Sequence, residues 1–142
     1  MTSTETETFE TIRLTADVVL IAAGHVLLIE RGWDPFEGMW ALPGGHVDAG
    51  EEVRTAAARE LTEETGITVA AADLREVGPF TAPGRDPRGR YVTVAYTGTL
   101  PERIEPTAGD DATEAVWWPL SWLPELAFDH AAIIRAAVES AA

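Results

Sequence analysis

The segment Gly45–Ile67, GHVDAGEEVRTAAARELTEETGI, is the part of the sequence that decides the fold. Residues from about Glu51 to Thr65 are predicted to form a helix, and Gly66 is predicted to end it. The apolar residues of this helix recur at spacings of four and would face a sheet: Val53, Ala57 and Leu61.

Three glutamates crowd one side of this predicted helix. Glu60 and Glu64 stand four residues apart, and Glu60 and Glu63 three apart. Like charges at these spacings destabilise a helix by about a few tenths of a kcal/mol per pair, and the C-terminal end of the helix dipole is already negative. A bound cation would relieve the repulsion, and oxygen ligands at this density suit Mg²⁺ or Mn²⁺. The alternative is a solvated acidic face.

The segment resembles the Nudix box, G-x5-E-x7-R-E-U-x-E-E-x-G-U, in which U is a bulky aliphatic residue. All nine fixed positions are met, by Gly45, Glu51, Arg59, Glu60, Leu61, Glu63, Glu64, Gly66 and Ile67. The flanking stretches GMWALPGG and EAVWWPL also resemble that family, so the similarity extends over roughly Thr15–Leu120. It implies an α/β fold, an α/β/α sandwich with a mixed sheet between helices, and a divalent-metal-dependent pyrophosphohydrolase.

The resemblance also implies a set of metal ligands. Glu60 and Glu64 would be the principal ligands of Mg²⁺, or of Mn²⁺, with Glu63 as a further ligand. The backbone carbonyl of Gly45, or of its neighbour Gly44, would add another, because glycine lets the backbone approach an ion closely.

The remaining catalytic candidates are charged residues in or after the same segment. Arg59 is expected to orient Glu51 or Glu60 through a charged hydrogen bond, and its alternative role is a surface ion pair with Glu63. A carboxylate must also take a proton from the attacking water. The candidates for this base are Glu51 and the loop residues Asp110, Asp111 and Glu114; the alternative for the two aspartates is an Asx-turn. Glu63 is counted among the catalytic residues as well as the metal ligands.

A second segment, APGRDPRGRYVTVAY, narrows the substrate. It resembles ADP-ribose pyrophosphatases of the Nudix family, which release AMP and ribose 5-phosphate. Arg85, Arg88 and Arg90 would hold phosphate or ribose there, although exposed arginines in a turn-rich hairpin are an almost equal alternative. Trp33, before the box, is a candidate for stacking on the base.

The other aromatic residues and the histidines are expected to be structural. Trp40 is predicted to lie in the core, and packing is the default expectation for the last three tryptophans, Trp117, Trp118 and Trp122. The three histidines, His25, His46 and His130, are isolated in the sequence and are expected in turns or at the surface.

The rest of the chain predicts strands and one more helix. The β-rich runs Thr15–Ala22 and His25–Arg31 suggest a hairpin, and Gly32–Gly45 reads as a loop. Further strands are expected at Leu74–Thr81, Tyr91–Leu100 and Ala115–Trp118, and a terminal helix at His130–Glu139. One domain over residues 13–142 would follow a flexible acidic leader at residues 1–12.

Composition excludes several functions. A net charge of −14 argues against a nucleic-acid polymer as partner, and no apolar run is long enough to span a membrane. All ten basic residues are Arg and there is no Cys, which predicts guanidinium contacts with phosphate and a cytoplasmic location.

The partner is therefore predicted to be a small nucleotide. The alternatives are an antimutator-type enzyme acting on oxidised dNTPs and a non-catalytic nucleotide-sensing domain. A homodimer is left open.

Overall fold

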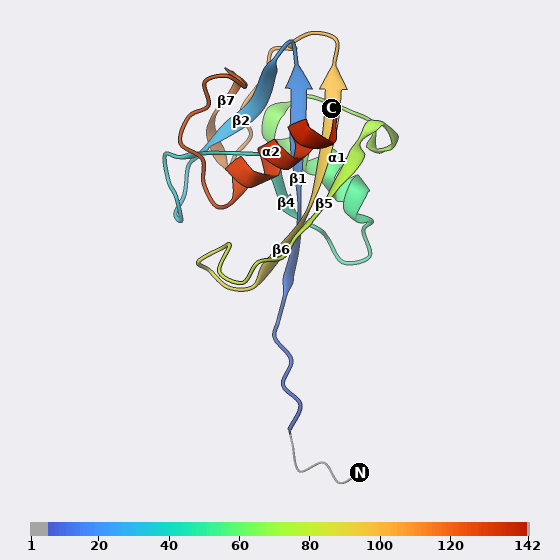
Figure 1. The fold of residues 1–142 in the computed structure, drawn as a ribbon, viewed down its shortest axis with the longest axis vertical. Helices are drawn as coiled ribbons and strands as arrows, with labels where there is room; N and C mark the ends of the chain where they lie inside the picture. The colour runs from blue at the N-terminus through green and yellow to red at the C-terminus, as the bar shows by residue number, and fades with distance from the viewer. Residues whose placement is uncertain (1–5, 142) are drawn as a thin grey trace.

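The central hairpin and a parallel partner strand organise the sheet in the computed structural model, which describes residues 6–141 (Figure 1). Strand β1 (Arg13–Ala22) turns back into β2 (His25–Arg31) through Ala23 and Gly24, both at positive φ. Such a two-residue turn matches the twist of a hairpin. The other elements are β3 (Trp40–Ala41), β4 (Gly44–His46), α1 (Val53–Thr65), the 3-10 helix η1 (Ala71–Asp73), β5 (Arg75–Phe80), β6 (Tyr91–Leu100), β7 (Ala112–Pro119) and α2 (His130–Ser140).

These strands form one mixed sheet of seven strands. Its main order is β3-β2-β1-β6-β5, while β4 pairs with β1 and β7 pairs with β2. Strands β1 and β6 are parallel over their whole length, from Arg13 opposite Tyr91 to Ala22 opposite Leu100. The remaining pairs are antiparallel. The predicted mixed sheet is thus confirmed.

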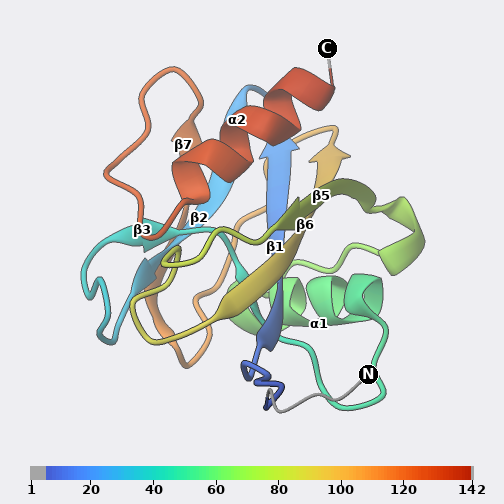
Figure 2. The same ribbon diagram turned by 60° about the horizontal axis from the view of Figure 1, so that its bottom comes forward.

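Helices α1 and α2 cover opposite faces of the sheet, as Figure 2 shows. Alternation along β1 explains this, because Val18 and Leu20 pack with the buried residues of α1 whereas Val19 packs with those of α2. The α1 side of the core includes Ala56, Ala57 and Leu61, and the α2 side includes Ile133, Ile134 and Ala137. The α/β/α sandwich is confirmed.

Helix α1 begins two residues later than predicted. It starts at Val53, and Glu52 is the extended N-cap. The carboxylate of Glu51 instead accepts a hydrogen bond from the Asp48 amide, which holds Glu51 outside the helix. The end of the helix is as predicted, since Gly66 adopts a φ of 73° and its N–H reaches the Thr62 carbonyl.

The structure differs from the prediction in the loop between β2 and α1 and at Trp122. The predicted loop between β2 and α1 contains β3 and β4, which are short and follow no alternating pattern. Trp40 lies in the core as predicted, in edge contact with Trp118 at 5.1 Å between centroids. Packing was the wrong expectation for Trp122, which is 78% exposed in a turn after β7.

The leader was predicted to be flexible. Residues 6–12 form no helix or strand and are exposed, and the start of the leader lies outside the described residues. None of the helices within residues 6–141 has the length and hydropathy that crossing a bilayer requires.

Replacement of Leu61 by alanine should destabilise the fold by about 2–5 kcal/mol, because the side chain is fully buried between α1 and the sheet. Urea denaturation measures the change. Val138→Ala, on the exposed side of α2, is the control and should change stability by less than about 0.5 kcal/mol. Equal effects of the two substitutions would contradict the assigned packing.

Candidate active site

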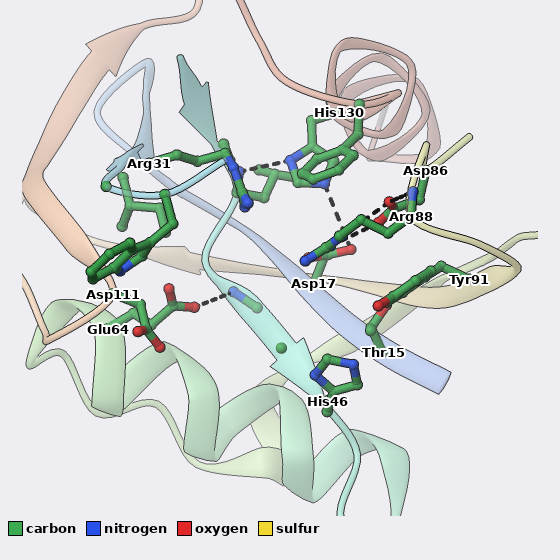
Figure 3. Close-up of a pocket in the computed structure, with 18 of the residues that line it drawn as sticks. Thr15, Asp17, Arg31, His46, Glu64, Asp86, Arg88, Tyr91, Asp111 and His130 are labelled. Atoms are coloured by element: carbon green, nitrogen blue, oxygen red, sulfur yellow. Dashed lines mark hydrogen bonds and ion pairs between the residues drawn. The ribbon is translucent and has the colours of Figure 1, made fainter. Parts of the chain in front are cut away.

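A cavity of about 310 Å³ lies beside the C-terminal end of α1 (Figure 3). Strands β1, β2 and β4, the loop between β5 and β6, and the start of α2 contribute its walls. Its charged lining residues are Asp17, Arg31, Asp34, Glu64, Arg85, Asp86, Arg88 and Asp111, with His46 and His130 beside them. The cavity therefore has carboxylates and guanidinium groups within one small volume.

Glu64 is the buried carboxylate at the α1 end of this cavity. Its residue exposure is only 7%, and one carboxylate oxygen accepts a hydrogen bond of 2.7 Å from the Gly44 amide. Burial raises the pKa of Glu64 to about 8, and the charges of Glu60, Asp17 and Asp111 add to the increase. The charges of three neighbouring carboxylates thus act on the buried Glu64.

Arg59 holds the other acidic residues of the segment together. It donates two hydrogen bonds to Glu51, at 2.8 and 2.9 Å, and one of 2.9 Å to Glu60. It also reaches Glu63 at 3.1 Å and the His46 carbonyl at 3.0 Å. Both roles considered for Arg59 are therefore present in the geometry: the contact with Glu51 and Glu60, and the ion pair with Glu63.

The same contacts decide how Glu51 can act. Its hydrogen bonds from Arg59, with a further one from the Asp48 amide, lower the pKa of Glu51 to about 2. A carboxylate with so low a pKa is a weak proton acceptor. The geometry favours Glu51 as the residue that fixes Arg59 over Glu51 as the base.

Glycine is required at position 44, where a side chain would meet backbone, and at position 45 it leaves room for the carboxylate of Glu60. A Cβ atom added to Gly45 would lie 2.5 Å from the carboxyl carbon of Glu60, and one added to Gly44 would overlap Asp17 and the Ala16 carbonyl. The Pro-Gly-Gly turn therefore lets β4 lie directly against both the helix and β1. This close approach is what brings Glu60 next to the backbone of Gly45.

The acidic side chains fit a divalent cation in chemistry, although they are not arranged around one. Among residues 6–141, no three Asp, Glu or His side chains surround a common point. Glu60 and Glu63 are paired with Arg59 instead. Burial raises the pKa of Glu60, as do Glu63 and Asp111. A cation between Glu60 and Glu64 would remove this repulsion, provided that Glu60 turns away from Arg59.

The acidic loop before β7 contributes one residue to the cavity. Asp111 lies next to Glu64 in Figure 3, and its charge acts on both Glu60 and Glu64. Asp110 does not line the cavity, and Glu114 is exposed on β7 opposite Glu30. Of the candidate bases in this loop, the structure brings only Asp111 to the site.

Two of the three predicted substrate arginines reach the cavity, and each is paired. Arg85 donates to both oxygens of Asp129, at 2.6 and 2.8 Å. Arg88 donates to the buried Asp86 at 2.8 and 3.1 Å, and its guanidinium lies 4.8 Å from the centroid of the Tyr91 ring.

Of the other two predicted substrate-binding residues, Trp33 lies at the cavity and Arg90 does not. Arg90 lies outside the cavity and donates to Glu10 at 2.9 Å and to the Thr81 carbonyl at 3.1 Å. Trp33 lines the cavity and is 66% exposed, so its ring is available to a ligand.

The prediction for His130 was wrong. Its side chain is buried, and its Nδ1 accepts a 3.0 Å hydrogen bond from the Leu42 amide. Its Nε2 lies 3.9 Å from Asp17, which accepts a 2.6 Å hydrogen bond from Thr93. Burial lowers the pKa of His130, so the ring is neutral at pH 7. The sequence places His130 more than 100 residues from Asp17, and tertiary contact alone brings them together.

The other two histidines are in the predicted environments. His25 contacts the Ala23 carbonyl in the β1–β2 turn at 2.8 Å, and His46 is exposed at the cavity, 5.8 Å from Tyr91. Asp17, Arg31 and Tyr91 were not predicted as site residues. A usable signal was present for Asp17, because an aspartate in the apolar strand TADVVLIA is unusual without a local function.

The chain belongs to the Nudix family, because the model of the NUDIX domain matches residues 11–137. The curated ADP-ribose pyrophosphatase of Methanocaldococcus jannaschii is 42% identical to this chain over 119 residues, which cover 84% of this chain and 69% of that protein. The prediction of a Nudix hydrolase similar to ADP-ribose pyrophosphatases is thereby confirmed.

Two solved structures are similar along nearly the whole chain. The Nudix domain of Shewanella oneidensis NrtR in complex with ADP ribose superimposes with a TM-score of 0.86 at 31% identity, covering 94% of this chain and 91% of that one. A bifunctional NMN adenylyltransferase/ADP ribose pyrophosphatase from Francisella tularensis, complexed with AMP and a Mn ion, superimposes with a TM-score of 0.85 at 28% identity. That match covers 96% of this chain and 44% of the other.

The raised pKa of Glu64 predicts how the metal-free protein responds to pH. The folded state takes up a proton on Glu64 more readily than the unfolded state, so stability should fall as pH rises from 4.5 to about 8. Thermal unfolding in EDTA, measured as a function of pH, checks this. The melting temperature of Glu64→Gln should fall less over this pH range than that of the wild type. His130 contributes the opposite slope below pH 6.5 and is common to both proteins. Superimposable profiles of wild type and Glu64→Gln would contradict the assigned environment of Glu64.

Proposed function

We propose that this chain hydrolyses ADP-ribose to AMP and ribose 5-phosphate with Mg²⁺ or Mn²⁺ as the cofactor. The observation that carries the proposal is the cavity, in which the buried Glu64 and the exposed Asp111 lie opposite the guanidinium groups of Arg31 and Arg88. Its volume lies at the lower end of the range for small-molecule sites, about 300–1,000 Å³. The named activity of the Methanocaldococcus relative and the ligands of the two structural neighbours support the choice of substrate.

The proposed metal ligands are Glu60 and Glu64, with Glu63 and the Gly45 carbonyl as further ligands. A bound divalent cation would neutralise the diphosphate and stabilise the charge that develops at phosphorus. Glu64 is already aimed at the cavity by the Gly44 amide. Glu60 is within reach only if it gives up its hydrogen bond with Arg59.

Arg59 and Glu51 are proposed to act as positioning residues. After Glu60 turns, Arg59 keeps its paired hydrogen bonds to Glu51 and its contact with the His46 carbonyl. These contacts tie the residues before α1 to the helix itself. They would hold β4 and Gly45 against the cavity while the carboxylates change partners.

Asp111 is proposed to take the proton from the attacking water. It lies at the cavity beside Glu64 and is exposed, and no described arginine pairs with it. Glu63 is the second candidate for the base, because its side chain is exposed and held only by Arg59. Glu114 does not line the cavity and lies opposite Glu30 on β7, so it is not proposed as the base.

The adenine of the substrate is proposed to stack on Trp33, whose exposed ring lies at the cavity. Arg88 is proposed to hold phosphate or ribose with the guanidinium edge that Asp86 leaves free. Arg85 would contribute by positioning Asp129 and the start of α2, because both oxygens of Asp129 already occupy it.

One observation favours a second function, binding of ADP-ribose without hydrolysis. The pairing of Glu60 and Glu63 with Arg59 is the arrangement expected if these carboxylates never bind a metal. Hydrolysis of oxidised dNTPs is the other enzymatic alternative, since the same metal-binding helix would serve both substrates. Measured turnover distinguishes these functions.

Incubation of the purified protein with Mg²⁺ and a nucleotide panel should yield AMP and ribose 5-phosphate from ADP-ribose at a higher kcat/KM than any product from oxidised dGTP. Glu64→Gln should lower kcat by at least about 100-fold while leaving the fold intact, because it removes a metal-facing charge and keeps the shape of the side chain. Chromatography of the products measures both.

Glu52→Gln is the matched control at the N-cap of the same helix, because Glu52 is exposed and lies outside the cavity. It should retain the activity of the wild type. Binding of ADP-ribose without turnover would support the second function. Unchanged kcat in Glu64→Gln would contradict the proposed role of this residue.

A further inference from the structure

His130 stands at the first position of α2, where other parts of the fold meet it. Its side chain is buried and lines the cavity. Its Nδ1 accepts the 3.0 Å hydrogen bond from the Leu42 amide, between β3 and β4, and Asp17 of β1 lies on its other side. Arg85 fixes this end of the helix, because it donates to both oxygens of the N-cap residue Asp129. These contacts hold the ring in one orientation.

The contact with Leu42 decides which nitrogen of the ring carries the proton. Nδ1 can accept the Leu42 N–H only if it has no hydrogen of its own, so the neutral ring has its N–H at Nε2. The Asp17 carboxylate lies 3.9 Å from Nε2, which is too far for a hydrogen bond. Nε2 forms no hydrogen bond with any of residues 6–141. A buried donor without an acceptor is costly unless a ligand or a water molecule supplies one.

Asp17 provides the complementary group beside this donor. Its carboxylate is buried and accepts a 2.6 Å hydrogen bond from Thr93 on β6, which leaves further lone pairs for a second donor. Figure 3 shows Asp17 and His130 pointing toward one another across a gap at the cavity. The pair therefore offers one acceptor and one donor to a ligand, 3.9 Å apart.

This pair fits a hydroxyl group better than an anion. A hydroxyl oxygen between the two side chains can accept from Nε2 and donate to the carboxylate, because it has both functions and no charge. A phosphate oxygen would be repelled by the charge of Asp17 and has no hydrogen to donate to it. Ribose is the part of the proposed substrate that is rich in hydroxyl groups.

We propose that His130 and Asp17 together bind one ribose hydroxyl of the substrate and so select ribose over deoxyribose. The identity of the ligand rests on the proposed function, whereas the hydroxyl site follows from the geometry of the two side chains. ADP-ribose contains two riboses, one attached to adenine and one at the other end of the diphosphate. Because the same pair of groups would recognise a hydroxyl of either, the experiment compares both.

Binding of ribose 5-phosphate and of AMP in the presence of Mg²⁺, measured by isothermal titration calorimetry, tests the site without turnover. Each ligand is compared with analogues that lack one ribose hydroxyl at a time. For one of the two ligands, loss of one hydroxyl should weaken binding to the wild type about tenfold, the size expected for a hydrogen bond to a charged group. The ligand that shows this ratio identifies the ribose that is bound.

His130→Asn separates recognition from structure. Asparagine keeps an oxygen near the position of Nδ1 for the Leu42 amide and removes Nε2, so the ligand and its deoxy analogue should bind within about twofold of each other. A purely structural role would weaken both ligands equally and leave the ratio at about tenfold. His25→Asn is the matched control, because His25 lies in the β1–β2 turn outside the cavity, and it should keep the ratio of the wild type.

If His130→Asn does not fold, Asp17→Asn keeps the shape of the side chain, removes the charged acceptor and should also lower the ratio. An unchanged ratio in the folded variants would overturn the proposal, as would a wild type that binds neither ligand or that binds the deoxy analogues equally well. Equal weakening of AMP and its deoxy analogues in His130→Asn, with ribose 5-phosphate unaffected, would indicate contact with adenine and would also overturn it. A wild type that selects ribose through His130 and fails to hydrolyse ADP-ribose would refute the proposed function and leave the hydroxyl site standing.

Discussion

The close approach of α1 to β4 is the constraint on which the site depends. Gly44 and Gly45 have no side chains, so the strand lies against the helix and the Gly44 amide reaches Glu64. This contact buries a carboxylate among Glu60, Asp17 and Asp111, where its charge is costly. Such an arrangement is understandable if a positive charge occupies the site during function.

The cavity contains groups of both charges, acidic side chains at α1 and arginines across from them. The carboxylates at the α1 end of the cavity would attract a cation. Arg31 and Arg88, of which Arg88 is already paired with Asp86 on one edge, would attract an anion. A diphosphate carrying a divalent cation supplies both charges in one ligand. The net charge of −14 favours a diphosphate whose charge is neutralised by a cation, because most of the surface would repel a free diphosphate.

The sequence predicted the elements that have strong local patterns. The hairpin, β6, the end of α1 and the terminal helix were found because alternation, helical spacing and a terminal glycine act within a few residues. The start of α1 was missed because the side chain of Glu51 bonds to the Asp48 amide and Arg59, which competes with the helix. The short β3 and β4 depend on pairing with distant strands and carry no such pattern.

The glutamates of the site were predicted from one segment, and Trp33, Arg85, Arg88 and Asp111 from their own local sequences, whereas three other cavity residues were not predicted as site residues. Asp17, Arg31 and His130 come from three separate elements and meet only through the sheet topology.

The central claim is that Glu64 and its neighbours bind a divalent cation. Anomalous diffraction from crystals soaked in Mn²⁺ tests it most directly. A peak within about 2.5 Å of oxygens of both Glu60 and Glu64 is predicted. Absence of a peak there, with Glu60 still bonded to Arg59, would contradict it.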